Sequence, residues 1–151
     1  MRIGEYCKRQ VVSINANADI SEAATRMREQ HVGFLVVYRA GDDHRRPIGV
    51  LTDRDIVLQV TAARVDPQSV RVEDAMTRDP LIANESDDLA DLLEGMRIAG
   101  IRRVPVVDSI GALSGVIAID DAIDVITGLL CNISGSLKSE QRQEWSRRRV
   151  S

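Results

Sequence analysis

The chain has 151 residues, of which 44% are hydrophobic and 3% aromatic, and its formal net charge is -3. A core can form, but it must be built from aliphatic side chains, and few aromatic rings are present for stacking on nucleic-acid bases. The negative net charge provides no basic field for DNA or RNA. We therefore do not expect a nucleic-acid partner.

We expect neither a membrane-spanning segment nor a secretory signal in this sequence. No unbroken apolar run approaches the roughly 20 residues that a membrane-spanning helix needs. The N-terminus, which begins Met1-Arg2-Ile3, lacks the apolar stretch of a secretory signal. We expect no membrane insertion and a cytoplasmic protein. The only cysteines, Cys7 and Cys131, are isolated, so we interpret them as reduced thiols, with a disulfide or redox role as the alternative.

The sequence contains two copies of one pattern of apolar positions and punctuating residues. Identity between the copies is low, and the length difference falls in a polar connection, where such changes are tolerated. The aligned landmarks, first copy and then second, are residues 3–9 with 72–78, Asp19 with Asp88, Val37 with Val106, and Gly49 with Gly115.

Each copy predicts the same order of elements, β-α-β-β-α. An amphipathic helix follows an acidic N-cap, because apolar residues recur at i, i+3, i+4 and i+7 after Asp19 and again after Asp88. The next strand is a near-continuous apolar run, as expected for a strand covered on both faces. The predicted elements are strand 11–14, a helix from 20, strands 34–38 and 49–51, helix 53–61, strand 81–83, a helix from 89, strands 104–107 and 115–118, and helix 120–130.

The predicted fold class is therefore α/β, in the α+β sense. It consists of two β-α-β-β-α repeats packed sheet to sheet in a pseudo-two-fold arrangement. Two copies of about 60 residues would each be marginal alone, which favours a shared core. The expected divisions are residues 3–65 for the first repeat, 70–130 for the second, and 131–151 for a polar C-terminal tail.

The tail differs in composition from the repeats. Residues 132–136 contain Asn, Gly and two Ser, which predicts a helix stop and a linker. Residues 137–150 are polar and mixed in charge, and either a loosely docked helix or a disordered segment fits them. Arg147, Arg148 and Arg149 form a basic triplet that we interpret as solvated, with contact to nucleic acid or anionic lipid as the alternative.

The first copy joins a strand to a helix in the run GVLTDRD, residues 49–55. Thr52 can cap the helix N-terminus, whose amide groups form a natural anion site. Asp55 lies in the first turn, where a carboxylate can accept two hydrogen bonds from adjacent ribose hydroxyls. A first-turn acid also simply favours the helix dipole. Arg54 is either a ligand contact or a solvated charge.

This duplicated pattern, with GVLTDRD, the Met76-Thr77 lead-in and residues 103–108 (RVPVVD), resembles the CBS-pair family over roughly residues 3–130. The resemblance implies a regulatory module that binds an adenosine-containing ligand, and it implies a homodimer. In the family the adenine is held by the first strand, the ribose by the carboxylate, and the phosphates by basic residues before the proline-containing strand. The ligand-binding residues implied here are Val12, Ile14, Thr52, Arg54, Asp55, Ile82, Arg102, Arg103, Pro105 and Asp121.

The two copies differ at the predicted site. Ala118 stands where the first copy has Thr52, so a hydroxyl is missing. Asp120 stands where the first copy has Arg54, which removes a positive charge and adds a negative one. Because like charges repel strongly in a partly buried cleft, a phosphate is disfavoured beside the second copy.

Our hypothesis is one productive site rather than two. Thr52 and Asp55 would hold the ligand, and Arg102 or Arg103 would reach its phosphate from the facing copy. The second cleft, around Asp121, would be empty, weak or fitted to an uncharged group.

No catalytic machinery is visible. His31 and His44 are distant in sequence, and no His/Cys/Asp/Glu cluster has metal-ligand spacing. Nucleophile-elbow, P-loop and dinucleotide motifs are absent from the sequence. We therefore predict no enzyme, no metal and no catalytic cofactor.

The predicted function is signal transduction. The resemblance implies AMP, ADP, ATP or S-adenosylmethionine as the ligand, and a conformational shift that an unknown effector protein detects. A ligand-free CBS-pair dimerisation or scaffold module is the first alternative. A nucleic-acid-associated factor that uses the arginine-rich tail is the second.

Overall fold

The computed structural model describes residues 1–148, which form two small β-sheets, five α-helices, one 3₁₀ turn and one π-helical turn. The first repeat contains η1 (Ile3–Glu5), β1 (Ser13–Asn15), α1 (Ile20–Gln30), β2 (Phe34–Tyr38), β3 (Pro47–Thr52), α2 (Asp53–Ile56) and the π turn η2 (Val57–Thr61). The second contains α3 (Val72–Ala75), β4 (Thr77–Arg78), β5 (Ala83–Asn84), α4 (Leu89–Ala99), β6 (Arg103–Val107), β7 (Leu113–Ala118) and α5 (Ile119–Arg148).

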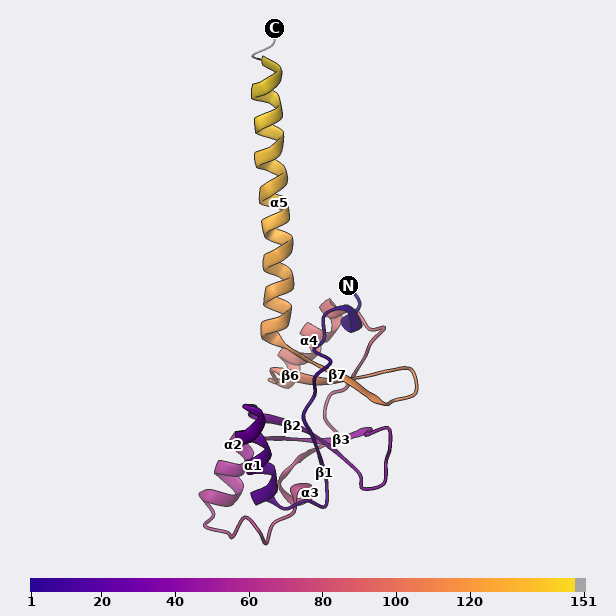
Figure 1. Ribbon diagram of the computed structural model, residues 1–151, viewed down its shortest axis with the longest axis vertical. Coiled ribbons are helices and arrows are strands. Elements are labelled where there is room, and N and C mark those ends of the chain that lie inside the picture. Colours follow the sequence, from indigo (N-terminus) through magenta and orange to yellow (C-terminus); the bar gives the residue numbers. More distant parts are fainter. Residues whose placement is uncertain (149–151) are drawn as a thin grey trace.

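The two sheets are stacked along the long axis of the molecule, with their helices on the outer sides (Figure 1). The strand orders are β1-β2-β3-β4 and β5-β6-β7. In both sheets the first pair of strands is parallel and the second is antiparallel. The irregularity at Val37/Tyr38 in one sheet recurs at Val106/Val107 in the other. The predicted α+β class with two β-α-β-β-α repeats is confirmed.

The helix caps follow the sequence pattern. The Asp19 carboxylate accepts a hydrogen bond from the backbone N–H of Glu22 at 2.8 Å, and Asp88 accepts one from the N–H of Ala90 at 2.8 Å. Each helix ends on a left-handed residue at the aligned position, His31 with φ 55° and Gly100 with φ 66°. The apolar faces of both helices are buried, which confirms the predicted amphipathic helices.

The N-terminal segment packs on the second repeat, not on its own. Ile3 is fully buried in the core of the second repeat. Its backbone N–H donates to the carbonyl of Asp87 at 3.0 Å, and Lys8 and Val116 exchange two backbone hydrogen bonds of 2.9 Å. The first residues of the chain therefore complete the second core.

The first residues of the second repeat in turn complete the core of the first repeat. The two repeats therefore exchange their lead-in segments. Val72, Ala75 and Met76 are buried in the core of the first repeat. The N–H of Val72 donates to the carbonyl of Ala18 at 2.8 Å, and β4 adds to β3 as the fourth strand of the first sheet. The divisions 3–65 and 70–130 follow the sequence repeat, whereas each spatial core is closed by a segment of the other copy.

Alternate strand positions supply the surface between the two sheets. Side chains along a strand point to opposite faces in turn. Leu35 and Val37 lie in the first core, whereas Val36, between them, is fully buried outside it. Pro105 occupies the aligned position between Val104 and Val106 and is also buried. The central strands therefore bury both faces, as their continuous apolar runs predict.

The prediction of a helix stop at residues 132–136 is wrong, because α5 runs unbroken from Ile119 to Arg148. The Ser136 hydroxyl donates to the carbonyl of Asn132 at 3.0 Å, and that of Ser139 to the carbonyl of Gly135 at 3.0 Å. These bonds satisfy the hydroxyls within the helix, so the polar residues do not interrupt it. The basic triplet ends at Arg149, which lies outside the described residues.

Other boundaries shift slightly. The first strand of each copy begins two residues later than predicted, at Ser13 and at Ala83. The helix predicted from 53 to 61 does end at Thr61, but its second half is a π turn rather than an α-helix. The segment before β1 is extended without forming a strand, and this leaves Val11 and Val12 available to the space between the repeats.

The exchange predicts that one residue near the N-terminus stabilises a distant core. Replacing Ile3 by Ala should lower the free energy of unfolding by about 2–5 kcal/mol, because it opens a cavity in the second core. Ile98 on α4 is 73% exposed, so Ile98→Ala is the matched control and should change stability little. Urea denaturation monitored by circular dichroism measures both. Equal effects of the two substitutions would contradict the exchange.

Candidate functional site

A cavity of about 250 Å³ lies between the two repeats. Its wall from the first copy includes the extended segment before β1 and the turn between α1 and β2. Its wall from the second copy comes from β6, β7 and the first turn of α5. The lining residues are Lys8, Gln10, Val11, Val12, His31, Val32, Gly33 and Phe34 from the first copy, and Arg103, Val116, Ala118, Asp120 and Asp121 from the second.

Asp121 is the buried carboxylate of this cavity, with a side chain only 9% exposed. Its Oδ2 accepts a hydrogen bond from the backbone N–H of Ala118 at 2.8 Å, which fixes the side chain at the start of α5. Its Oδ1 pairs with Nζ of Lys8 at 2.8 Å. This hydrogen bond holds the pKa of Lys8 above its ordinary value. The Lys8 side chain is 72% exposed, so the ion pair lies at the mouth of the cavity.

The two predicted arginines lie differently. Arg103 lines the cavity, and no carboxylate of the described residues forms an ion pair with it. The neighbouring Arg102 is not a lining residue, and its guanidinium lies 3.6 Å from Oδ1 of Asp120. Arg103 and Lys8 therefore give the cavity two positive charges, and Arg102 partly neutralises one of its two acidic groups.

The apolar wall is formed by valines. Val11, Val12 and Val32 come from the first copy and Val116 from the second. A second hollow, of about 360 Å³, shares Lys8, Gln10, Val12 and Val32 with the cavity, so the space continues beyond the valines. Position 33 of the lining requires glycine, because the Asp53 side chain approaches it closely. A Cβ on Gly33 would lie 2.9 Å from Cγ of Asp53.

Thr52 and Asp55 form a reciprocal capping box at the start of α2. Oδ2 of Asp55 accepts hydrogen bonds from the backbone N–H and the hydroxyl of Thr52, both at 2.8 Å. The Thr52 hydroxyl accepts in turn from the N–H of Asp55 at 3.1 Å. Thr52 is thus the helix cap that the sequence predicts. Oδ1 of Asp55 accepts no hydrogen bond from the residues that the structure describes.

The structure groups the predicted residues in a different way from the sequence pattern. Val12 and Arg103 line one cavity with Asp121, not with Thr52 and Asp55. The reason is that β6 and β7 pair Arg103 with Ala118, three residues before Asp121, so the arginine and this aspartate share a sheet edge.

Four further predicted residues lie outside the cavity lining. Arg54 is exposed on α2 and Ile82 is partly buried just before β5. Ile14 is fully buried in the first core. Pro105 is buried within β6. None of these four side chains lines the cavity around Asp121.

The comparisons with known proteins agree with this architecture. The CBS domain profile matches residues 3–61 and again residues 72–128. This chain belongs to the CBS domain family. It is 36% identical over 112 residues to the CBS domain-containing protein YhcV of Bacillus subtilis, an alignment that covers 74% of this chain and 76% of the relative.

Solved CBS structures have the same fold. A CBS domain protein from Pyrobaculum aerophilum, complexed with AMP, is 33% identical with a TM-score of 0.72, and the match covers 80% of this chain and 89% of that one. A hexameric CBS-CP12 protein from bloom-forming cyanobacteria is 27% identical with a TM-score of 0.70, over 82% of this chain and 69% of that one.

Several residues that line the cavity of this CBS pair were not predicted from the sequence. Lys8 and Gln10 precede the first strand. Residues 31–33 connect α1 to Phe34, the first residue of β2. A signal for the second group exists, because Gly33 and Phe34 align with Arg102 and Arg103, which the pattern does select. No such signal marks Lys8, because its position beside Asp121 depends on the exchange of the N-terminal segment.

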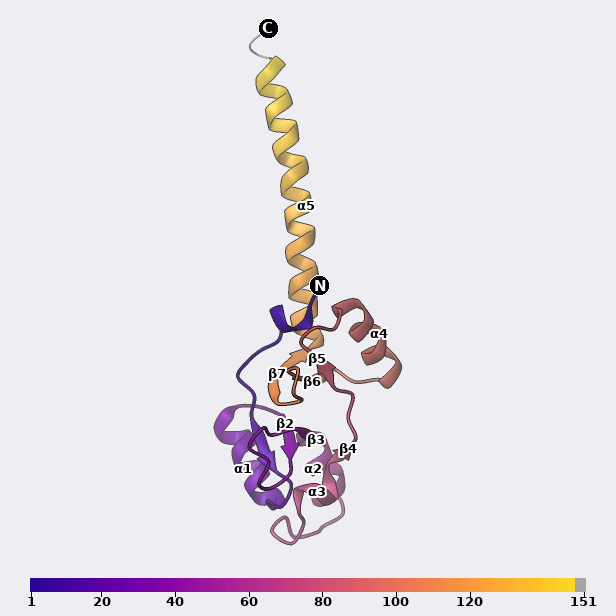
Figure 2. The same ribbon diagram turned by 90° about the vertical axis from the view of Figure 1, so that its right-hand side faces the viewer.

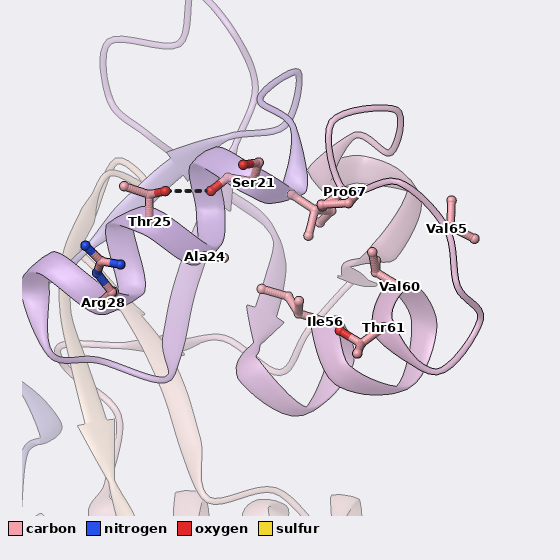
Figure 3. Close-up of a pocket in the computed structure, with 10 residues that line it drawn as sticks. Ser21, Ala24, Thr25, Arg28, Ile56, Val60, Thr61, Val65 and Pro67 are labelled. Carbon is pink, nitrogen blue, oxygen red and sulfur yellow. Dashed lines mark hydrogen bonds between the residues drawn. The ribbon is translucent and has the colours of Figure 1, made fainter.

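A third and larger hollow, of about 490 Å³, lies on the outer face of the first CBS motif, between α1 and the α2–η2 helix (Figure 3). Its lining is mainly aliphatic, with Arg28 as its only charged residue. The Thr25 hydroxyl there already donates to the carbonyl of Ser21 at 2.9 Å. Since this groove has no carboxylate for a ribose diol, the cavity between the motifs is the better candidate site.

Other chemistry is limited in the described part of the chain. Burial raises the pKa of the Cys7 thiol, which disfavours the reactive thiolate. Cys7 is partly buried, whereas Cys131 is exposed on α5. Within residues 1–148, no group of three or more His, Cys, Asp and Glu side chains is placed to hold a metal ion. The described helices include none that is long and apolar enough to cross a membrane.

Proposed function

We propose that this CBS pair is a regulatory module that binds an adenosine-containing ligand between its two motifs. The observation that carries the proposal is the cavity, which gathers Asp121, two cations and a valine wall from distant parts of the chain. A carboxylate, cations and an apolar wall suit the ribose diol, phosphate and purine of such a ligand. The AMP bound to the Pyrobaculum relative supports the same class, which includes ADP, ATP and S-adenosylmethionine.

Binding would exchange one ion pair for two ligand contacts. The ribose diol would donate to Oδ1 of Asp121 in place of Lys8. The released ammonium, together with Arg103, would then face the phosphate. This proposal departs from the sequence-based hypothesis that disfavours a phosphate beside the second copy, because Lys8, Arg103 and the Arg102 that pairs with Asp120 would offset the acidic charge there. Because Asp121 is held from behind by the N–H of Ala118, its position does not change when its partner does. The purine would lie against Val12 and its neighbours, with backbone groups of the extended segment available for hydrogen bonds.

The same arrangement suggests how the signal leaves the site. The cavity is lined by both motifs, so a ligand that contacts both would favour one relative arrangement and shift the population toward it. A separate effector protein would detect the change. We place this function in the cytoplasm, in a homo-oligomer and without catalysis by the chain itself.

Thr52 and Asp55 are the proposed second position. Asp55 aligns with Asp121, and its Oδ1 has no partner among the described residues. Thr52 also supplies the hydroxyl that Ala118 lacks. A ligand here would contact the end of β3 and the start of α2, at the site that the sequence pattern favours.

One observation favours a second candidate function, a ligand-free scaffold module. The Lys8–Asp121 pair already satisfies the buried carboxylate of the cavity. The cavity volume of about 250 Å³ is also below the roughly 300–1,000 Å³ of most small-molecule sites, unless the adjoining hollow is included. The scaffold function predicts that no nucleotide changes the stability of the fold.

A thermal shift of the purified protein separates the two functions. AMP, ADP, ATP and S-adenosylmethionine are tested, with GTP as the control. A ligand present at about 100 times its dissociation constant adds roughly 2.7 kcal/mol and should raise the melting temperature by about 5–10 °C. A rise with an adenosine compound but not with GTP supports the module. No rise with any compound supports the scaffold.

Two matched variants assign the position. Asp121→Asn and Asp55→Asn both keep an acceptor for the capping N–H but remove the carboxylate. A hydrogen bond to a charged group contributes about 1.5–3 kcal/mol, so the variant at the occupied position should bind about 10- to 100-fold more weakly. We expect this loss for Asp121→Asn. A loss in neither variant would refute a carboxylate-held ribose.

The ion-pair exchange makes a separate prediction about Lys8. In Lys8→Met the affinity for AMP should fall roughly 5-fold, since an exposed ion pair contributes about 1 kcal/mol. Adenosine has no phosphate, so its affinity should stay the same or increase as Asp121 becomes free. The matched control is Lys138→Met, because Lys138 is the other lysine of the chain and lies exposed on α5. Isothermal titration calorimetry measures the ratio of the affinity for AMP to the affinity for adenosine in each variant. A ratio that is the same in Lys8→Met as in the wild type would contradict the proposed transfer of Lys8 from Asp121 to the phosphate.

A further inference from the structure

Helix α5 projects away from the two CBS motifs in both views (Figures 1 and 2). Only its first turns contact the body of the protein. Ala122 is 2% exposed, and Val125 packs against the second core. Every residue from Ile126 to Glu140 is exposed. A helix this long without tertiary contacts has no packing to stabilise it, although packing supplies most of the stability of helices in proteins.

The projecting part of α5 carries an apolar stripe. Its side chains follow one another at alternating spacings of three and four residues, which places them along one face with the period of a coiled coil. No charged residue occurs between Asp124 and Lys138. We call this set the α5 stripe; its members and their exposed fractions are Ile123 (55%), Ile126 (43%), Leu130 (62%), Ile133 (60%) and Leu137 (58%).

We propose that the α5 stripe is covered by the α5 helix of a second copy of this chain, in a coiled-coil interface. The stripe extends about 21 Å along the helix axis, at 1.5 Å per residue, and an identical stripe matches it in length and spacing. Thr127, Leu129, Ser134 and Ser136 flank the stripe. Since these flanking residues carry no charge, two copies meet without repulsion, and nothing there selects an acidic or basic partner.

The sequence also defines where the seam ends. The next position in the three-four spacing is Glu140, an exposed acid. A carboxylate in the seam between two helices is costly to bury without a partner. The apolar contact therefore stops at Leu137. This interface is distinct from the ligand cavity, and it does not rest on the proposed function.

The test is the mass of the full-length protein in solution, measured by light scattering over a dilution series. The chain has a mass of 16.7 kDa, and the proposal predicts a wild-type assembly of at least twice that mass. Ile126→Glu combined with Ile133→Glu places charges in the stripe and should lower the mass at least by half. The control, Asn132→Glu combined with Ser139→Glu, adds the same charge on the opposite face and should keep the wild-type mass.

A milder variant disturbs the fold less and tests the same interface. Leu130→Ser removes one apolar side chain from the stripe and should weaken association at least 10-fold. Far-UV circular dichroism and thermal melting report whether the CBS motifs of each variant remain folded. A wild-type protein with the mass of one chain would overturn the proposal. So would a folded stripe variant that keeps the wild-type mass, because another face would then join the copies.

Discussion

The exchange of the two lead-in segments is the constraint on which the rest of this structure depends. Ile3 closes the core of the second CBS motif, and Val72 closes the core of the first. Neither motif can complete its core from consecutive residues, so the two cannot separate without opening both. The same exchange explains why glycine stands at position 115 in β7. A Cβ on Gly115 would lie 2.7 Å from Sγ of Cys7, which belongs to the crossing N-terminal segment.

The exchange also creates the candidate site. The backbone pairing of Lys8 with Val116 carries a cation of the first motif onto the sheet of the second, beside Asp121. The segment that follows it, with Val11 and Val12, crosses back toward the first sheet and forms the apolar wall. Asp121 lies in the first turn of α5, so the helix that projects from the molecule begins at the cavity. A ligand bound as proposed would therefore contact the base of that helix.

The local elements could be predicted from the sequence because their signals are local. Asp19 and Asp88 are caps, and the apolar spacing after them defines two helices. The repeat itself indicated the duplicated fold. The site was harder, because the partners of Asp121 are set by pairings between distant segments that leave no local pattern. The continuity of α5 was missed because Gly135 and Ser136 suggest a turn in isolation. Within the helix the Ser136 hydroxyl donates to the carbonyl of Asn132, and the carbonyl of Gly135 accepts from the hydroxyl of Ser139.

A crystal structure of the protein grown with saturating AMP would test the proposed binding site most directly. The proposed binding mode predicts density for the nucleotide between the two motifs, with the ribose diol on Asp121, the purine against Val12 and the phosphate facing Lys8 and Arg103. It also predicts that Lys8 has left the carboxylate. A complex with AMP bound away from this cavity, or with the Lys8–Asp121 pair intact beside the nucleotide, would rule out this binding mode.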